Sequence, residues 1–576
     1  MDGDEKTNGA SPSKPLRLLP GVIIVILQWL IRFFIPNVIH GDTALMIGLS
    51  GGLLGGLAVG IWWVFFSRAP VIERWGAIVM IIASLFVTSF LLDESIATAN
   101  LGLMFVFFSI PVMSLAFVIW AIASHRLSPV PRRVTMIMTI VLASGMWIFL
   151  RTDGMDAELH HDLKWRWAET AEERLITRSK GELTSLPSLT AVSDTGGYWP
   201  GFRGPDRNSI VHGLQIRTDW SESLPAEMWR RPIGPGCSSF AVHGAIFFTQ
   251  EQLGEDEIVS CYDLTTGKPV WKHRDKARFY DSHAGAGPRS TPTLAGGRVY
   301  TLGATGILNV LNAVDGSVIW SRNAASENGV KVLNWGFTGS PLVVNNTVVV
   351  SLSGKLAAYD GENGKLKWSC PDGGNSYSSP HSITIDGVSQ ILLMSGSGAV
   401  SVEPADGKTL WKYDWPVGDR ILQPAVIEEG DLLLAGEMKG ISRVKVSHPE
   451  GKWTVKEIWT SAEMKLNFND FIIHKGYAYG FDGPRIECID ISNGKARWRG
   501  DPYRGWLLLL ADQDMLLVLS EKGEVAIVEA NPEKFIKLAQ FKAIRGKTWN
   551  HPVIASDVLL VRNNLEMAAF RLSRQN

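Results

Sequence analysis

The sequence predicts an all-β eight-bladed propeller with four-stranded blades, preceded by an α-helical membrane domain of five transmembrane helices. Two observations carry this prediction: long apolar stretches are confined to the first 150 of 576 residues, and one turn-and-tryptophan motif recurs through the rest. The formal net charge is −1 and no long basic run is present, which argues against a nucleic-acid partner. The expected domains are a cytoplasmic tail at 1–17, transmembrane helices at 18–150, a helix and linker at 151–197, and the propeller at 198–576.

Five apolar stretches form the expected membrane domain, at 21–39, 44–66, 76–92, 102–123 and 134–150. Each is near the ~20 residues that a helix needs to cross the hydrocarbon core of a bilayer. Four of them contain no charged residue, whereas the first carries Arg32. We interpret Arg32 as a side chain that reaches toward the lipid headgroups, so all five stretches are expected to span the membrane.

The basic residues of the connections alternate along the chain. Arginines occur in SRAPVIER and SHRLSPVPRR, and Lys6, Lys14 and Arg17 lie in the tail, whereas HGD and DESIATAN contain neither lysine nor arginine. Because positively charged connections stay in the cytoplasm, this pattern predicts a cytoplasmic N-terminus, five crossings and an extracytoplasmic C-terminal part.

Two further segments connect these domains. Residues 153–177 are polar with two tryptophans, which predicts a short helix at the membrane surface, and residues 178–197 have the Ser-, Thr- and Gly-rich composition of a tether. The four cysteines of the chain lie far apart and form no CxxC pair. We therefore expect small core residues and neither disulfides nor a metal site.

A short motif, DLTTGKPVW at 263–271, recurs with a glycine four residues before each tryptophan. Extending the spacing in both directions gives seven tryptophan anchors, with Phe541 in the place of an eighth. The seven anchors are Trp229, Trp271, Trp320, Trp368, Trp411, Trp459 and Trp498. A period in the forties with several short strands per repeat is typical of a propeller.

The anchors are interpreted as structural residues. The glycine supplies the positive φ that a tight hairpin requires, and the tryptophan is expected on the outermost strand, packed against the neighbouring blade. The strand around Trp229 has no blade of its own, so we expect it to complete the last blade and close the ring without a free edge. This predicts eight blades, with seven as the alternative because the repeats around 440–460 and 525–541 are degenerate.

The unit YDLTTGKPVW at 262–271 resembles the repeat of pyrroloquinoline quinone (PQQ)-type β-propellers, and the likeness covers about residues 199–576. The segment WPGFRGPDRN at 199–208 also resembles a bacterial group of BamB-like repeat proteins. That superfamily includes non-catalytic scaffolds as well as quinoprotein dehydrogenases. The resemblance implies a multi-pass protein of the bacterial inner membrane with a periplasmic propeller, a layout similar to that of membrane glucose dehydrogenases.

The innermost strands of a propeller line its central channel, so polar residues in the loops before these strands are candidates for ligand binding. In the dehydrogenases of the superfamily, PQQ sits on Ca²⁺ in the channel mouth, and a carboxylate takes a proton from the substrate. Under this alternative, a membrane-bound enzyme that oxidises alcohols or sugars, Asp470 is the candidate base. The candidate ligand-binding residues are Arg289, His381, Arg420, Asp470 and Asn550.

One aspartate among these candidates is a poor ligand set for Ca²⁺. Repeats of about 45 residues also leave no room for the long insertions that enclose PQQ in the enzymes. We therefore expect a non-catalytic binding or scaffolding module that is anchored in the membrane and engages protein or small-molecule partners in the periplasm. No cofactor, metal or nucleic acid is expected.

Overall fold

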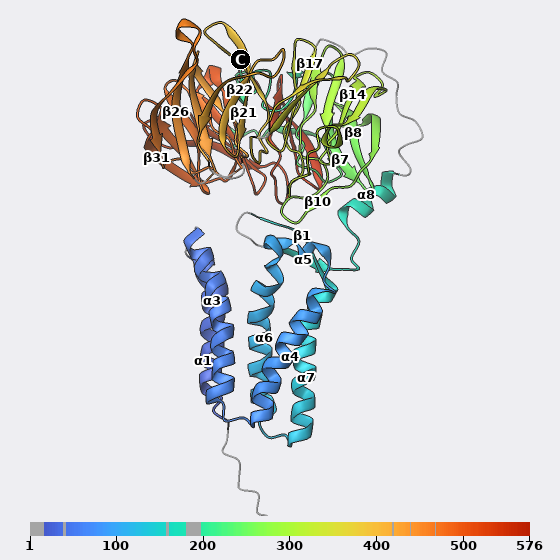
Figure 1. The fold of residues 1–576 in the computed structure, drawn as a ribbon, viewed down its shortest axis with the longest axis vertical. Coiled ribbons are helices and arrows are strands. Elements are labelled where there is room, and N and C mark those ends of the chain that lie inside the picture. Colours follow the sequence, from blue (N-terminus) through green and yellow to red (C-terminus); the bar gives the residue numbers. More distant parts are fainter. Residues whose placement is uncertain are drawn as a thin grey trace, which may run out of the picture. The chain divides into compact units, whose positions relative to one another are not determined.

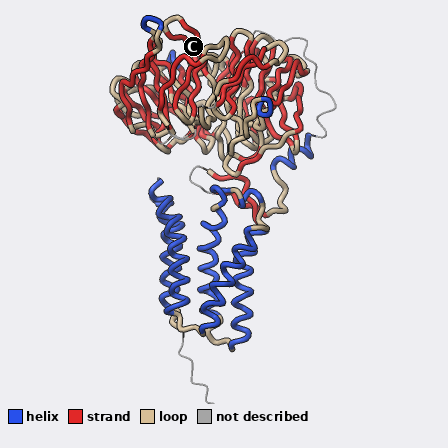
Figure 2. The backbone as a smooth tube through the Cα atoms, in the orientation of Figure 1, coloured by secondary structure: helices blue, strands red, loops and turns tan. Residues whose placement is uncertain are grey.

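The computed structural model describes residues 16–38, 42–156, 161–179, 197–371, 373–416, 420–437, 439–466 and 468–575. The chain divides into two compact units, Met1–Ala168 and Glu169–Asn576. Helices dominate the first unit and strands the second (Figure 1, Figure 2). The two units, which differ in composition, therefore also differ in fold.

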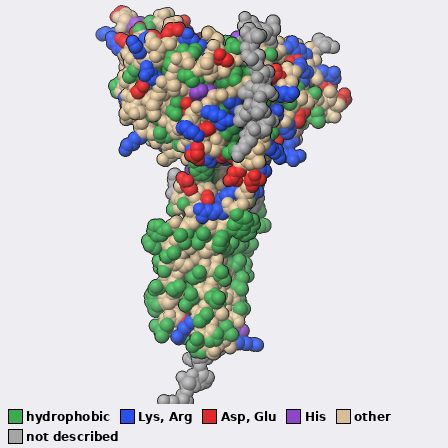
Figure 3. Space-filling view, turned by 90° about the vertical axis from the view of Figure 1, so that its right-hand side faces the viewer, with side chains coloured by type: hydrophobic (Ala, Val, Ile, Leu, Met, Phe, Trp, Pro, Cys, Tyr) green, Lys and Arg blue, Asp and Glu red, His purple; other side chains and the backbone are tan. Residues whose placement is uncertain are grey.

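Hydrophobic side chains cover the visible face of the helical unit (Figure 3). Among the described residues, four helices are long and apolar enough to cross a membrane, Ala44–Phe66, Val71–Ser89, Met104–Ala123 and Pro129–Phe149. The apolar helix Leu19–Phe34 is shorter than these four. The structure thus has an apolar helical region with four candidate spans, where the sequence predicted five.

The helical elements follow the predicted stretches closely. They are α1 (Leu19–Trp29), a π-helical turn (Leu30–Phe34), α2 (Ile35–Val38), α3 (Asp42–Ile61), a π-helical turn (Trp62–Phe66), α4 (Val71–Ser89), α5 (Glu94–Ala97), a 3₁₀ turn (Ala99–Gly102), α6 (Met104–Ala123), α7 (Pro129–Gly145) and a 3₁₀ turn (Met146–Phe149). The position of the Arg32 side chain differs from the one that we expected. Its side chain is buried, and the guanidinium lies 4.7 Å from the centre of the Phe108 ring on α6, so it packs against a neighbouring helix.

The helix predicted at 153–177 is wrong over its first half. β1 (Leu150–Met155) and β2 (His161–Trp165) form an antiparallel hairpin, and helix α8 covers Ala171–Ser179. The hairpin is fixed by a tertiary contact, because the backbone N–H of Thr152 donates to Ser95 Oγ at 2.9 Å. A local pattern of polar residues contains no information about such a contact.

In the described part of the second unit, the strands form eight blades, which confirms the predicted number. We number them in chain order. Blade 1 contains β6 (Ala241–Gly244), β7 (Ile246–Leu253), β8 (Asp256–Asp263) and β9 (Pro269–Lys276); blade 2 contains β12 (Thr293–Ala295), β13 (Arg298–Leu302), β14 (Ile307–Asn312) and β15 (Val318–Asn323); blade 3 contains β16 (Leu342–Val344), β17 (Thr347–Leu352), β18 (Lys355–Asp360) and β19 (Leu366–Ser369); blade 4 contains β20 (His381–Ile385), β21 (Val388–Ser395), β22 (Gly398–Val402) and β23 (Thr409–Asp414).

The second half of the ring repeats this arrangement. Blade 5 contains β24 (Ala425–Glu428), β25 (Asp431–Gly436), β26 (Gly440–Ser447) and β27 (Thr454–Ser461); blade 6 contains β28 (Ile472–His474), β29 (Tyr477–Asp482), β30 (Arg485–Asp490) and β31 (Lys495–Pro502); blade 7 contains β32 (Gly505–Leu510), β33 (Met515–Ser520), β34 (Glu524–Glu529) and β35 (Lys537–Lys542); blade 8 contains β36 (Val553–Ala555), β37 (Val558–Arg562), β38 (Glu566–Arg571) and β5 (Ala226–Pro232). Short elements complete the unit, namely β10 (Tyr280–Asp281), β11 (Gly285–Ala286) and α9 (Ala324–Glu327).

Blade 8 is closed by the N-terminal strand, as the sequence predicted. β5 pairs antiparallel with β38, and Trp229 lies opposite Ala569. The outermost strand of the last blade therefore comes from the start of the propeller. This closure joins an early strand and the last strand of the propeller in one sheet and leaves no unpaired edge between the first and last blades.

Trp271 shows how neighbouring blades are joined. It lies on β9, and its Nε1 donates to the backbone oxygen of Ala313 in blade 2 at 3.1 Å. Gly316 of blade 2 has a φ of +73°, and a Cβ atom there would lie 2.5 Å from the Trp271 ring. The glycine therefore permits the turn and also leaves room for the ring of the preceding blade. The same pairing joins Trp229 with Gly267, Trp320 with Gly364, Trp368 with Gly407, and Trp459 with Gly494.

Trp411 is bonded differently. Its Nε1 donates to Gln390 Oε1 of its own blade at 2.7 Å. The corresponding hairpin of blade 5 contains Gly451, and no atom lies within 4 Å of a Cβ atom built there. Blade 5 thus lacks the turn that receives the ring in blades 1, 2, 3, 4 and 6, in keeping with its degenerate sequence.

Candidate functional site at the mouth of the propeller channel

Residues 197–211, which we call the plug segment, connect opposite sides of the propeller. Its β3 (Gly197–Trp199) pairs with β6 of blade 1, and its β4 (Ile210–Val211) pairs in parallel with β32 of blade 7. Between these strands, two arginines reach carbonyl groups of blades 3, 4 and 6. Because blades 3 and 7 face each other across an eight-bladed ring, the plug segment crosses the channel axis.

Arg207 occupies the part of this crossing next to blades 3 and 4. Its guanidinium donates to the backbone oxygens of Pro380 at 2.9 Å and Ser340 at 3.3 Å, and also to that of Pro341. Burial lowers the pKa of Arg207 to about 10. A planar guanidinium carries five N–H donors, so one side chain can satisfy carbonyl groups at the ends of two blades.

Arg203 holds the other side of the crossing. Its Nη2 donates to the backbone oxygen of Phe471 at 3.0 Å, and its Nη1 lies 3.6 Å from Asp470 Oδ2. Its Nε donates to Ser209 Oγ at 2.9 Å, and that oxygen lies 3.0 Å from Nε2 of His551. Arg203 has a φ of +62°, a conformation that non-glycine residues keep only where the surrounding contacts fix it.

Two of the predicted site residues, His381 and Asp470, are brought together beside the plug segment. Gln423 links them, since its Oε1 lies 3.0 Å from His381 Nε2 and its backbone N–H donates to Asp470 Oδ1 at 2.7 Å. Burial raises the pKa of the Asp470 carboxyl, and Arg203 opposes this shift. Burial, and after it the nearby arginines, lower the pKa of His381 to about 3, so this imidazole is neutral at physiological pH.

The other three predicted site residues lie apart from this group and bind other partners. Arg289 forms an ion pair with Asp281 at 2.5 Å. Arg420 donates to the backbone oxygens of Ala435 at 2.7 Å and Ser395 at 3.1 Å and also to that of Trp415, and Asn550 donates to two more at 2.9 and 2.8 Å. All three side chains are buried, which gives them a structural role in the loops before the innermost strands.

The residues around the plug segment do not fit PQQ held on Ca²⁺. Calcium takes about six to eight oxygen ligands, and carboxylates usually supply its charge balance. The Asp470 carboxylate is already shared between Arg203 and the N–H of Gln423. In the described residues, no group of three or more His, Cys, Asp or Glu side chains is arranged to hold a metal ion. No reaction step is therefore assigned to a quinone here.

Aromatic side chains gather around the plug segment, in a group that we call the aromatic arc. It consists of Phe202, Trp335, Tyr377, Phe468, Trp506 and Trp549. Phe202 belongs to the plug segment, and the other five lie at or just before the innermost strands of blades 3, 4, 6, 7 and 8. The rings are in contact: Phe468 and Trp549 have centres 5.2 Å apart, and Trp335 and Tyr377 4.8 Å apart.

The two halves of the aromatic arc are joined by Lys547 and His283. The Nζ atom of Lys547 lies 4.1 Å from the centre of the Trp549 ring and donates to the backbone oxygen of His283 at 2.6 Å. The His283 ring lies 6.2 Å from that of Trp335. Because Trp506 Nε1 also donates to the backbone oxygen of Trp549 at 2.8 Å, the rings are held in place.

The aromatic arc has the properties of a recognition surface. All its members except Tyr377 are partly exposed, and Phe202 of the plug segment has its ring centre 6.3 Å from that of Trp506. Rigid aromatic rings lose little conformational entropy on binding and are enriched among the residues that dominate protein interfaces. This geometry favours docking of an apolar or aromatic group of a partner onto the closed channel mouth.

Reasoning from the sequence missed the two plug arginines and the aromatic arc. The signal for the arc was Trp335, Trp506 and Trp549, three tryptophans that lie outside the anchor spacing and were left without a role. The signal for the plug was WPGFRGPDRN. This stretch has no strand periodicity, and it contains two aromatic residues and two arginines that a simple linker does not require.

The propeller is similar to proteins of two kinds. A family described as outer membrane protein assembly factor BamB matches residues 255–500. BamB of Yersinia pestis is 22% identical over 368 residues, which cover 59% of this chain and 86% of that protein. The quinohemoprotein alcohol dehydrogenase ADH-IIG of Pseudomonas putida is 27% identical over 164 residues, which cover 27% of this chain and 21% of that protein.

The solved structure of the quinohemoprotein alcohol dehydrogenase ADHIIG from Pseudomonas putida has a TM-score of 0.50 at 15% identity. The match covers 66% of this chain and 81% of that one, and it supports the fold alone. Together with the eight blades and the repeated tryptophan–glycine pairs, the BamB match and the BamB relative confirm the predicted resemblance to PQQ-repeat, BamB-like propellers.

Proposed function

We propose that this protein is a membrane-anchored propeller that binds a protein partner through the aromatic arc, without a cofactor. The observation that carries the proposal is the combination of a channel crossed by the chain's own arginines with a partly exposed group of aromatic residues beside it. The match to proteins named as outer membrane protein assembly factors supports a partner that is itself a protein. The work of such a module is recognition and scaffolding.

We further propose that the helical unit spans the bacterial inner membrane five times. The first apolar helix supports this count, because α1, the π-helical turn and α2 run without interruption from Leu19 to Val38. Twenty helical residues extend about 30 Å, the thickness of the hydrocarbon core. With the alternating basic connections, five crossings place the N-terminus in the cytoplasm and the propeller in the periplasm.

The proposed binding surface is tested by co-purification of the full chain with its partner from cross-linked membranes of the native host. The double variant Trp335→Ala/Phe468→Ala removes two rings of the aromatic arc. Truncation of a central aromatic residue at an interface costs about 2 kcal/mol or more, so the double variant should bind at least about a hundredfold more weakly. Leu538→Ala, which removes an exposed leucine from β35 of blade 7, is the control and should retain the partner. Equal recovery with all three proteins would contradict the proposed surface.

A PQQ- and Ca²⁺-dependent dehydrogenase is the second candidate, and the match to ADH-IIG is the observation that favours it. The test is a titration of the full chain with PQQ and Ca²⁺ while thermal unfolding is followed. A ligand that binds only the folded protein adds about 2.7 kcal/mol of stability at a hundredfold excess over its Kd. Our proposal expects no calcium-dependent shift. A clear shift would favour the enzyme and make Asp470 the first base to replace.

A further inference from the structure

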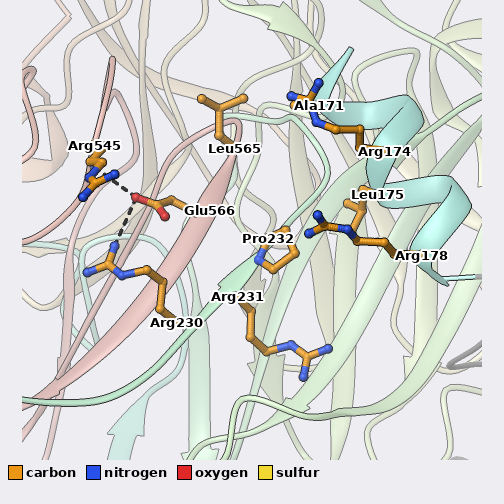
Figure 4. Close-up of a pocket in the computed structure, with 10 residues that line it drawn as sticks. All are labelled: Ala171, Arg174, Leu175, Arg178, Arg230, Arg231, Pro232, Arg545, Leu565 and Glu566. Atoms are coloured by element: carbon orange, nitrogen blue, oxygen red, sulfur yellow. Dashed lines mark hydrogen bonds and ion pairs between the residues drawn. The ribbon is translucent and has the colours of Figure 1, made fainter. Parts of the chain in front are cut away.

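A second candidate site lies at the edge of blade 8, where β5 is the outermost strand. A cavity of about 490 Å³ opens between helix α8 and the edge of blade 8 (Figure 4). Its charged lining consists of Arg174, Arg178, Arg230, Arg231, Arg545 and Glu566. The lining thus contains five arginines and one glutamate, in a space of the size that small ligands occupy, and Arg230 is also paired with Glu227 at 2.7 Å.

The wall formed by α8 is fixed in place. Glu172 accepts a hydrogen bond from the backbone N–H of Gly254 at 2.7 Å and from Nη1 of Arg278 at 2.9 Å, which ties the helix to blade 1. The helix begins with a capping box, in which Thr170 N–H donates to Glu173 Oε2 at 2.6 Å and Glu173 N–H donates to Thr170 Oγ1 at 3.0 Å. The cavity is thus formed before any ligand arrives.

The nearby carboxylates, Glu566 and Glu227, both pair with Arg230 and do not neutralise the other arginines of the cavity. Glu566 Oε1 accepts from Arg230 Nη1 at 3.1 Å and from the backbone N–H of Arg545 at 3.0 Å, so it is occupied by one guanidinium and one amide (Figure 4). Within the described part of the chain, the guanidinium groups of Arg178 and Arg545 have neither an ion pair nor a hydrogen bond. They are exposed and available to a ligand.

We propose that this cavity binds a ligand that carries phosphate groups. Guanidinium groups bind phosphate through two parallel N–H···O bonds, and proteins commonly bind multiply charged oxyanions with a cluster of arginines. Leu175 and Leu565 also line the cavity, which leaves an apolar wall for the organic part of the ligand. The phosphate can belong to a soluble ester or to the headgroup of an anionic phospholipid, and the experiment separates these two sources. The site is independent of the aromatic arc and of the proposed function.

The test uses the full chain in a neutral detergent and two probes, inorganic pyrophosphate and dihexanoyl phosphatidylglycerol below its critical micelle concentration. Binding is measured by calorimetry for the wild type and for Arg178→Ala/Arg545→Ala. Removing two guanidinium groups removes their charge-assisted hydrogen bonds to the phosphate, so the double variant should bind each probe at least about tenfold more weakly. The control is Arg571→Ala/Arg574→Ala, which removes the same charge from exposed positions near Asp557 outside the cavity.

Three results are distinguishable. Binding of pyrophosphate that falls in the double variant and persists in the control supports the site and a soluble phosphate ligand. Binding of the lipid alone, with the same dependence on the variants, supports the site and a headgroup ligand. No binding of either probe to the wild type, or an equal loss in the double variant and the control, overturns the proposal. Unchanged melting temperatures for both variants show that the fold is intact.

Discussion

Replacing Arg207 by methionine tests whether the plug segment is part of the propeller's structure. Methionine keeps most of the aliphatic length of the side chain and removes the guanidinium. Three buried carbonyl groups, of Ser340, Pro341 and Pro380, each lose a donor. Each lost partner costs about 1–2 kcal/mol, and removing a buried cation returns part of this, so we expect a net loss of about 3 kcal/mol.

This loss should be visible in thermal unfolding of the full chain. An unfolding entropy of about 2.1 cal/mol/K per residue over a propeller of about 380 residues gives about 0.8 kcal/mol/K, so 3 kcal/mol lowers Tm by about 4 °C. The control is Arg571→Met, which removes an exposed ion pair with Asp557 and should lower Tm by less than about 1 °C. Differential scanning calorimetry in detergent measures both shifts. If Arg207→Met lowers Tm no more than the control does, the plug segment does not support the ring and the reasoning is refuted.

Two further predictions concern a contact between blades and the buried His381. Gly364→Ala places a Cβ atom 2.7 Å from the Trp320 ring, whereas Gly387→Ala has a similar φ and open space, so Gly364→Ala should cost at least about 1 kcal/mol more in denaturant unfolding. His381→Gln should reduce the acid sensitivity of the protein. The pKa of His381 is about 3 when folded and about 6.5 when unfolded, so its contribution to stability is present above pH 6.5 and lost as pH falls toward 3. Between pH 7.5 and 5.0, wild type should lose about 2 kcal/mol more than His381→Gln, and equal losses would mean that this imidazole is not buried in its neutral form.

The propeller could be predicted because its signals are local and repeated. In five repeats a turn ending in glycine fixes one hairpin, and the tryptophan four residues later fixes the outermost strand. The regular spacing then extended these five anchors to eight, which gave eight blades. The closing strand could be predicted because Trp229 matches the anchor spacing but has no blade of its own before it. The second role of Gly316 and its equivalents, to leave room for a ring from another blade, depends on a contact between repeats and carries no local signal.

The candidate site could be predicted only in part. Spacing showed which part of each repeat carries His381, Asp470 or Arg420, and the structure places Arg420 and Asp470 in loops before innermost strands and His381 at the first position of one. Spacing could not show which partners these side chains find. The Arg420 guanidinium donates to backbone carbonyl oxygens, among them that of Ala435. Asp470 forms an ion pair with Arg203, which lies far away in the sequence. The pairing of β1 with β2 was missed for a similar reason, since a contact with Ser95 holds β1.

The most direct test of the central claim is site-specific photo-cross-linking of the full chain in its native membrane. A photoreactive phenylalanine analogue replaces Phe468 in the aromatic arc or, as the control, the exposed Leu538 on the outer strand of blade 7. Recognition at the channel mouth predicts a defined adduct with one protein from position 468 and none from position 538. An adduct from position 538 with no adduct from position 468 would contradict it and place the binding surface on the outer rim of the propeller.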